Sequence, residues 1–199
     1  MVAEKEDLED ESFSMETPVL RTERLVLRPP AEADVPSLMA LADNLKVAEM
    51  LARMSSPYGE AEARAFVAMA AKSNEAIYVL TVAGQRPGDG GTLIGCAGLN
   101  MTDRGLDLGF WIGEPYWKKG YATEAAHALV DLAFRGTTIS ALHASCRVIN
   151  PASRRVIHKC GFQYAGQGML NSLVAGKVPV ERYRLDRKTW VSLRTWRNS

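Results

Sequence analysis

The chain contains segments in which hydrophobic and polar residues alternate, and others in which hydrophobic residues recur at helical spacing. Residues 24–28 (Arg-Leu-Val-Leu-Arg) alternate strictly, which predicts a half-buried strand ended by the prolines at 29–30. In residues 60–72 the hydrophobic positions form one stripe, which predicts an amphipathic helix. The same criteria predict strands at 76–83, 92–99, 106–112 and 141–148, strands beginning at 162–166 and 180–186, and helices at 31–42, 122–134, 151–160 and 188–197.

The segments between these elements have the composition of turns. Residues 84–91 (GQRPGDGG) predict a flexible hairpin loop, and residues 103–105 (Asp-Arg-Gly) predict a tight turn. Pro36 indicates that the first helix begins near Asp34, which would serve as its N-cap. The order strand, two helices, three strands, helix, strand, helix and two strands predicts an α/β protein in which helices cover a mixed sheet.

Composition and charge exclude several classes of protein. The 199 residues are 47% hydrophobic and 24% charged, with a net charge of +1, so no basic surface typical of nucleic-acid binding is expected. No hydrophobic run approaches the ~18–20 residues that span a membrane. Residues 1–19 are acidic and predict a flexible tail, not a signal peptide, before a single domain at 20–199. The spacing of the three cysteines and three histidines predicts neither a metal site nor disulfides, which fits a reducing cytoplasm.

Residues 106–126 (LDLGFWIGEPYWKKGYATEAA) contain the strongest functional signal. They predict a strand, a short break at Gly113 and Pro115, and the start of a helix. Small residues at Gly120 and Ala122 allow a ligand to approach the backbone amides of a helix N-terminus, which favour phosphate. An ordinary strand-to-helix turn explains the spacing equally well, since neither a Rossmann nor a Walker pattern is present.

The run EPYWKKGYATEA resembles the acyl-CoA pyrophosphate loop of the GNAT N-acetyltransferases, in particular the branch of the ribosomal-protein acetyltransferases RimJ and RimL. Trp117, Gly120 and Ala122 occupy the three defined positions of the family pattern. Lys118 replaces the usual glycine, so either it is strained in a left-handed backbone conformation or its ammonium group reaches a CoA phosphate. The resemblance implies that the pyrophosphate is bound by Trp117, Lys118, Lys119, Gly120, Tyr121, Ala122 and Thr123.

A second run, from Asn150 to Phe162, resembles the family signature Asn-x-x-Ser followed by Gly-Phe. The resemblance implies that Asn150 lies near the pantetheine arm and that Ser153 is the general acid that protonates the leaving thiolate. Helix capping is the alternative role for both residues. Arg154 is expected either to pair with CoA phosphates or to lie on a solvated helix face.

The strand at 106–112 also matches the family, in which two neighbouring strands separate to admit pantetheine. The resemblance implies that the backbone of Phe110, Trp111 and Ile112 binds pantetheine, while their side chains pack in the core. Asp107 stands where the branch often has glutamate, and it is the candidate base that deprotonates the amine. An exposed strand carboxylate without a catalytic role is the alternative.

The resemblance therefore implies a GNAT acyl-CoA N-acyltransferase fold, with a mostly antiparallel sheet of six to seven strands flanked by helices. The implied activity is direct transfer of an acetyl group from acetyl-CoA to a primary amine, on either a protein N-terminus or a small molecule, without a metal. A non-catalytic acyl-CoA-binding module of the same fold is the alternative function. The expected protein is a cytoplasmic monomer or homodimer without nucleic-acid or membrane partners, and residues 167–179 are expected to form a loop near the acceptor.

Overall fold

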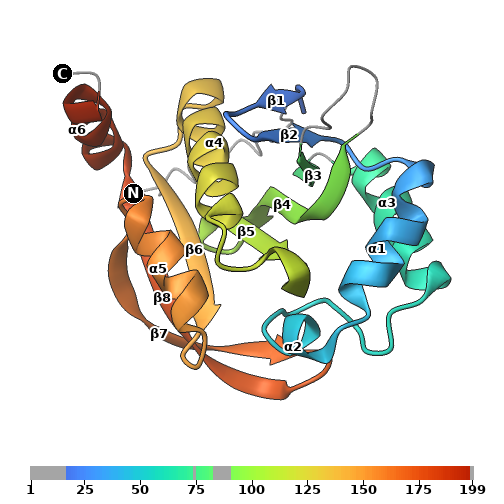
Figure 1. Ribbon diagram of the computed structural model, residues 1–199. Coiled ribbons are helices and arrows are strands. Elements are labelled where there is room, and N and C mark those ends of the chain that lie inside the picture. Colours follow the sequence, from blue (N-terminus) through green and yellow to red (C-terminus); the bar gives the residue numbers. More distant parts are fainter. Residues whose placement is uncertain (1–16, 74, 83–90, 198–199) are drawn as a thin grey trace, which may run out of the picture.

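The computed structural model describes residues 17–73, 75–82 and 91–197 (Figure 1). Most of the predicted tail, together with Ala83 and most of the loop predicted at 84–91, lies outside these residues. The strands are β1 (Leu20–Arg21), β2 (Leu25–Arg28), β3 (Ala76–Val82), β4 (Thr92–Thr102), β5 (Gly105–Ile112), β6 (Ala141–Arg147), β7 (Gln163–Ser172) and β8 (Gly176–Asp186). The helices are η1 (Glu32–Asp34), α1 (Val35–Ala42), α2 (Leu45–Ala48), α3 (Glu60–Lys72), η2 (Glu114–Tyr116), α4 (Tyr121–Gly136), α5 (Pro151–Lys159) and α6 (Arg187–Arg197).

The described strands form one sheet in the order β1-β2-β3-β4-β5-β6-β8-β7. Neighbouring strands are antiparallel except β5 and β6, which are parallel. The prediction of an α/β fold with a mixed, mostly antiparallel sheet is confirmed. The sheet has eight strands and not six or seven, because β1 is a two-residue strand that the hydrophobic pattern does not reveal.

Helices cover both faces of the sheet (Figure 1). The alternation of side chains along β3 assigns the two faces: Tyr78 and Leu80 pack in the cluster that includes α4 and α5, while Val79 packs with Val35 of α1 and Ala63 of α3. β5 follows the same rule, with Leu106 and Leu108 in the α4–α5 core. The side chains of the alternate residues, Asp107 and Trp111, therefore point to the α1–α3 face.

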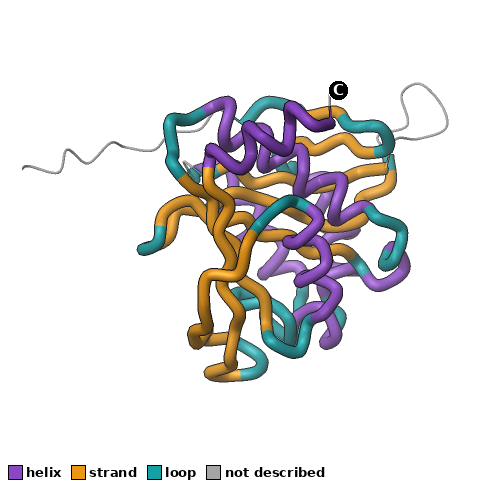
Figure 2. The backbone as a smooth tube through the Cα atoms, turned by 90° about the vertical axis from the view of Figure 1, so that its left-hand side faces the viewer, coloured by secondary structure: helices purple, strands orange, loops and turns teal. Residues whose placement is uncertain are grey.

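The prediction of a loop at residues 167–179 is wrong. Residues 163–186 form a long β7–β8 hairpin, whose strands run side by side to the lower end of the molecule in Figure 2. β7 is an edge strand with mostly exposed side chains, so its pairing with β8 and not its own hydrophobicity defines it. At the tip, the Leu173 amide donates to the Ala52 carbonyl (3.0 Å) and the Ser172 hydroxyl to the Leu51 carbonyl (2.9 Å). The hairpin tip is thereby attached to the segment that follows α2.

The first predicted helix begins as expected at Asp34, but its carboxylate does not cap α1. It instead accepts hydrogen bonds from both terminal nitrogens of Arg28 (2.8 and 2.7 Å) and from the Ala31 amide (2.8 Å). Among the described residues, no helix has the length and hydrophobicity needed to cross a membrane. Cys96, Cys146 and Cys160 are all buried, and none of them is in a disulfide.

Candidate active site

The two parallel strands separate near the centre of the sheet. β5 and β6 pair only at Asp107–His143 and Leu108–Ala144, although β5 continues to Ile112 and β6 to Arg147. On its other edge β5 pairs with β4 along its whole length, from Gly105 to Ile112. The final residues of β5 and β6 therefore face each other across a gap in hydrogen bonding. The prediction that these strands separate is confirmed by this register.

The backbone of β5 offers hydrogen-bonding groups to this gap. The amide of Gly113, directly after β5, donates to the carbonyl of Ile94 on β4 (2.8 Å), so the odd-numbered residues of β5 turn their backbone groups toward β4. The backbone groups of Phe110 and Ile112 consequently point toward β6. Trp117 Nε1 donates to the Ile112 carbonyl (2.5 Å), which fixes the following loop against the mouth of the gap.

This loop ends in the N-terminus of α4. Gly120 is the N-cap residue with a φ of 82°, and the first-turn residues Tyr121, Ala122 and Thr123 follow it, so their amides lie outside the helical ladder. Lys118 has a φ of 62° and is the non-glycine residue with positive φ in the described chain. Lys118 therefore adopts the left-handed backbone conformation expected at the position of the family glycine. Lys118 and Lys119 are exposed beside these amides, so positive charge is concentrated at this helix N-terminus.

Arg24 and Glu124 hold this loop against the first strands. Glu124 Oε1 accepts from the Thr22 hydroxyl (2.6 Å) and the Arg24 amide (2.7 Å), and its Oε2 accepts from Arg24 Nε (2.7 Å). Arg24 Nη1 in turn donates to the Lys119 carbonyl (2.9 Å). The sequence does not reveal this clamp, because about 100 residues separate Arg24 from Glu124, and the motif that contains Glu124 does not indicate its partner.

Asn150 and Ser153 lie at the start of α5, beyond the open end of β6. Asn150 Oδ1 accepts from the Ser153 amide (3.0 Å), so the capping role weighed for Asn150 is present. The Ser153 side chain is half-buried, and its hydroxyl has no hydrogen-bond partner among the described residues. That hydroxyl is available to a bound ligand.

Arg154 is half-buried and forms an ion pair with a neighbouring carboxylate. Its Nε donates to Glu181 on β8 (2.7 Å), and its Nη2 donates to the Val148 carbonyl (2.8 Å). The Tyr183 hydroxyl also donates to Glu181 (2.8 Å). These contacts lie on the α4–α5 side of the sheet and attach α5 to β8.

Asp107 lies on the opposite face, at the closed end of the gap. Its carboxylate is bonded to Arg104 Nη2 (2.6 Å), which also donates to Ser145 of β6 (2.8 Å). Burial raises the pKa of Asp107 to about 6, although the nearby Arg104 charge lowers it. Asp107 and the helix that carries Ser153 therefore lie on opposite faces of the sheet.

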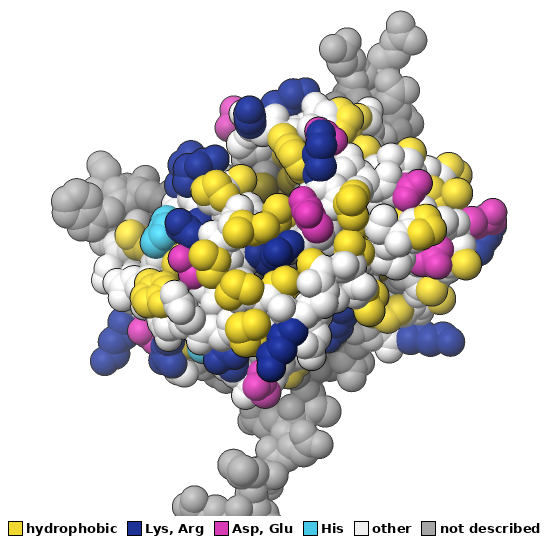
Figure 3. All heavy atoms as spheres, turned by 90° about the horizontal axis from the view of Figure 1, so that it is seen from below, with side chains coloured by type: hydrophobic (Ala, Val, Ile, Leu, Met, Phe, Trp, Pro, Cys, Tyr) yellow, Lys and Arg dark blue, Asp and Glu magenta, His cyan; other side chains and the backbone are white. Residues whose placement is uncertain are grey.

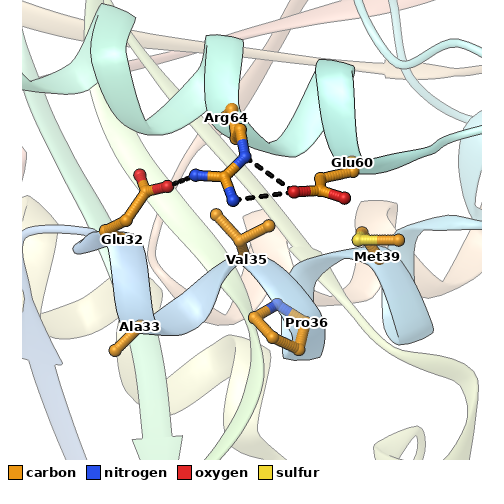
Figure 4. A pocket seen from close by; sticks show the side chains of 7 residues that line it. All are labelled: Glu32, Ala33, Val35, Pro36, Met39, Glu60 and Arg64. Atoms are coloured by element: carbon orange, nitrogen blue, oxygen red, sulfur yellow. Dashed lines mark hydrogen bonds and ion pairs between the residues drawn. The ribbon is translucent and has the colours of Figure 1, made fainter.

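A separate surface hollow lies between η1–α1 and α3 (Figure 4). Arg64 pairs there with both Glu32 and Glu60, so its charge is already balanced within the hollow. None of the candidate residues lines this hollow. In the described part of the chain, no three His, Cys, Asp or Glu side chains are grouped to hold a metal ion.

The fold, the separated strands and the amide-rich loop define an acyl-CoA-utilising transferase. Residues 24–163 match the acetyltransferase (GNAT) domain family, and the chain belongs to this family. It is an acetyl-CoA-dependent acyltransferase.

Relatives support this assignment. The chain is 28% identical over 152 residues to the uncharacterised N-acetyltransferase YoaA of Bacillus subtilis, covering 75% of this chain and 85% of that protein. It is 30% identical over 77 residues to the uncharacterised N-acetyltransferase p20 of Bacillus licheniformis, covering 37% of this chain and 43% of that protein. This second match thus spans less than half of the relative's length.

Solved structures share the fold. A GNAT-family acetyltransferase from Bacillus anthracis superposes with a TM-score of 0.72 at 21% identity, covering 86% of this chain and 99% of that one. Spermidine N-acetyltransferase from Vibrio cholerae, solved with CoA and spermine, gives a TM-score of 0.69 at 20% identity over 85% and 99% of the two chains.

Proposed function

We propose that this protein transfers an acetyl group from acetyl-CoA directly to a primary amine, as a cytoplasmic enzyme of the RimJ/RimL-like branch. The observation that carries the proposal is the early end of β5–β6 pairing beside a helix N-terminus with free amides. A gap bordered by unpaired strand backbone suits the extended, amide-containing pantetheine arm, and the α4 amides suit its pyrophosphate. The sequence run from Trp117 to Ala122 supports the branch assignment.

The β5 backbone and the loop would position the thioester. The backbone groups of Phe110 and Ile112 face the gap, and an amide there would donate to the carbonyl oxygen as it gains negative charge. Trp117 keeps the loop at the mouth, and the loop residues from Lys118 to Thr123 would hold the phosphates.

Asp107 and Ser153 would move the two protons of the reaction. Asp107 accepts a proton from the ammonium group of the acceptor, directly or through a water molecule, so that the free amine attacks the thioester carbon. A carboxylate with a pKa near 6 is ionised at neutral pH and is a stronger base than an ordinary aspartate. When the carbon–sulfur bond breaks, Ser153 donates a proton to the thiolate, and the attacking nitrogen gives up its remaining surplus proton, which returns to Ser153 through solvent.

Thiol release from acetyl-CoA with a panel of primary amines tests the proposal, with the acetylated product confirmed by mass spectrometry. We expect Asp107→Asn and Ser153→Ala each to lower kcat by about 10- to 1000-fold while acetyl-CoA affinity changes less than threefold. Wild-type turnover in both variants would remove these residues from the mechanism. Tight acetyl-CoA binding without turnover of any amine would instead support the non-catalytic module.

A further inference from the structure

Arg147, at the end of β6, lies at the open end of the gap on the face opposite α4 and α5. Side chains alternate between the two faces along β6. Ala144 and Cys146 are buried in the α4–α5 core, so Ser145 and Arg147 lie on the opposite face. Arg147 Nη1 donates to the carbonyl of Glu49, the C-cap residue of α2 (2.5 Å). Trp111 of β5 packs against the cluster formed by Ala42, Val47, Ala48 and Met54, beside the same helix.

The charge of Arg147 is not balanced by the described protein. The side chain is half-buried, its Nε is fully buried without a hydrogen-bond partner, and no carboxylate among the described residues forms an ion pair with it. Glu49 contributes its carbonyl to Arg147 but no ion pair. A guanidinium group whose single protein partner is a neutral carbonyl favours an additional oxyanion, which its remaining Nη N–H groups can bind.

The position of Arg147 separates it from the phosphates of CoA. The candidate pyrophosphate loop precedes α4, and α4 packs on the other face of the sheet. The acceptor amine must reach the thioester from the face that the loop leaves open, which is the face of Asp107, Trp111 and Arg147. An anion beside Arg147 would therefore belong to the acceptor.

The surrounding structure closes one side of the region around Arg147. β6 pairs with β8, and the tip of the β7–β8 hairpin is hydrogen-bonded to Leu51 and Ala52. Arg147 itself donates a hydrogen bond to the Glu49 carbonyl. These contacts connect β6, the hairpin tip and the end of α2 into a closed ring. Figure 3 looks onto this lower end of the molecule, where basic side chains lie centrally among hydrophobic ones.

We infer that the acceptor is a primary amine that also carries an oxyanion, a carboxylate or a phosphate, and that Arg147 binds this anion. The inference rests on the proposed acetyl transfer and names the substrate class.

Matched amines test the inference. Amino acids are compared with their carboxamides, and O-phosphoethanolamine with ethanolamine, by kcat/KM in the full-length protein. We expect at least one anionic member to exceed its neutral partner by about tenfold or more, since a charged hydrogen bond is worth roughly that factor. The better of the carboxylate and phosphate pairs identifies the anion. Equal use of anionic and neutral partners would overturn the inference and leave acetyl transfer intact.

Variants of Arg147 give the second readout. Arg147→Gln should raise KM for the anionic acceptor about tenfold or more, with little change for the neutral one, and Arg147→Lys should restore part of the difference. Arg135→Gln, at an exposed position near the end of α4, makes the same charge change and should keep wild-type selectivity. An equal loss for both acceptors in Arg147→Gln would show a structural role and overturn the inference.

If no amine is acetylated, the proposed function fails and binding decides the inference separately. The same anionic amines are then titrated calorimetrically into the protein saturated with CoA. Binding that Arg147→Gln weakens about tenfold or more would support the anion site, and absence of binding to the wild-type protein would overturn it.

Discussion

At the scale of single residues, two positions combine a proposed functional role with an unfavourable conformation or environment. Lys118 has a left-handed backbone with a φ of 62°, which costs an L-residue with a side chain about 1–2 kcal/mol relative to the right-handed region. Asp107 is a carboxyl group whose burial favours its neutral form. Both residues are therefore expected to reduce stability, as is common for residues at functional sites.

Replacing Lys118 separates backbone strain from phosphate binding. Lys118→Gly should raise the free energy of unfolding by about 0.5–1 kcal/mol, because glycine adopts positive φ freely but is more flexible when unfolded. Lys118→Ala keeps the strain and removes the charge. If the ammonium group binds a CoA phosphate, calorimetry should show weaker acetyl-CoA binding by both variants, by about 3- to 10-fold. Unchanged affinity in both would leave strain as the consequence of this lysine.

Asp107→Asn should lower activity while increasing stability. Folding raises the pKa of Asp107 from 3.8 to about 6. The protonated carboxyl group therefore contributes its whole share of the free energy of unfolding below about pH 4, and this contribution is lost as the pH rises through 6. At pH 7 the folded protein contains the ionised form, and a neutral amide should raise the free energy of unfolding by about 1–3 kcal/mol. Denaturant unfolding at pH 5 and 8 measures this gain, which should be larger at pH 8. The exposed Asp186→Asn is the control and should show little change.

The pH dependence of the wild-type rate is a further consequence of the same group. If Asp107 is the base, kcat/KM should fall about tenfold per pH unit below about pH 6, as the carboxylate becomes protonated. This inflection should be absent in the residual activity of Asp107→Asn. An unchanged inflection in the variant would assign it to another group.

At the scale of elements, the site depends on contacts between segments that are distant in sequence. The loop before α4 is attached to β5 through Trp117 and Ile112, and to the segment before β2 through Arg24 and Glu124. Hydrogen bonds from Thr22 and Arg24 outweigh the burial of Glu124 and lower its pKa. This carboxylate therefore stabilises the folded protein at neutral pH, and that stability is lost only as pH falls through its lowered pKa.

Glu124→Gln should loosen the loop. The ion pair with Arg24 is lost, so Arg24 is less firmly held against the Lys119 carbonyl. We expect acetyl-CoA affinity to fall about 3- to 10-fold and amide exchange of residues 118–122 to accelerate, with a loss of stability of about 1 kcal/mol. Glu60→Gln removes a carboxylate from the exposed pairs of α3 and should leave affinity unchanged. Equal affinity in both variants would show that the clamp does not position the loop.

At the scale of the whole molecule, one hydrophobic core continues across the place where β5 and β6 stop pairing. The α4–α5 core includes residues of β2 through β6 and of β8, so the two halves of the sheet remain joined below the gap by side-chain packing. The gap between β5 and β6 therefore leaves the core packed. We expect the molecule to unfold as one unit, so a ligand bound at the gap should stabilise all of it.

A thermal-shift comparison tests this expectation. Acetyl-CoA at about one hundred times its dissociation constant should stabilise the fold by about 2.7 kcal/mol, or roughly 5–10 °C for a domain of this size. ATP and NAD should produce no comparable shift, since neither contains pantetheine to occupy the gap. An equal shift with ATP would reduce the α4 loop to a general nucleotide site.

Sequence reasoning succeeded where short-range interactions are sufficient. The run from Asp107 to Ala122 specifies a strand, a break and a capped helix through neighbouring residues, and Asn150 caps α5 from within the same turn. The predicted strand beginning at 162–166 matches the start of β7, but the rest of β7 is predicted as a loop, because its exposed residues depend on pairing with β8. The pattern also missed α2, a helix of four residues. Local propensity is weak in both cases, and tertiary contacts decide the structure.

The sequence by itself determined the family, the strand–loop–helix unit and the candidate residues of the α4 loop, because these follow from patterns within about twenty residues. Only the tertiary structure decided where β5 and β6 separate, that Arg24 and Glu124 clamp the loop, and that Arg147 lies beside Glu49. These features depend on strand register and on side chains brought together by the sheet. The physical reason is that register and burial are properties of the packed molecule, and no single segment of the chain contains both partners.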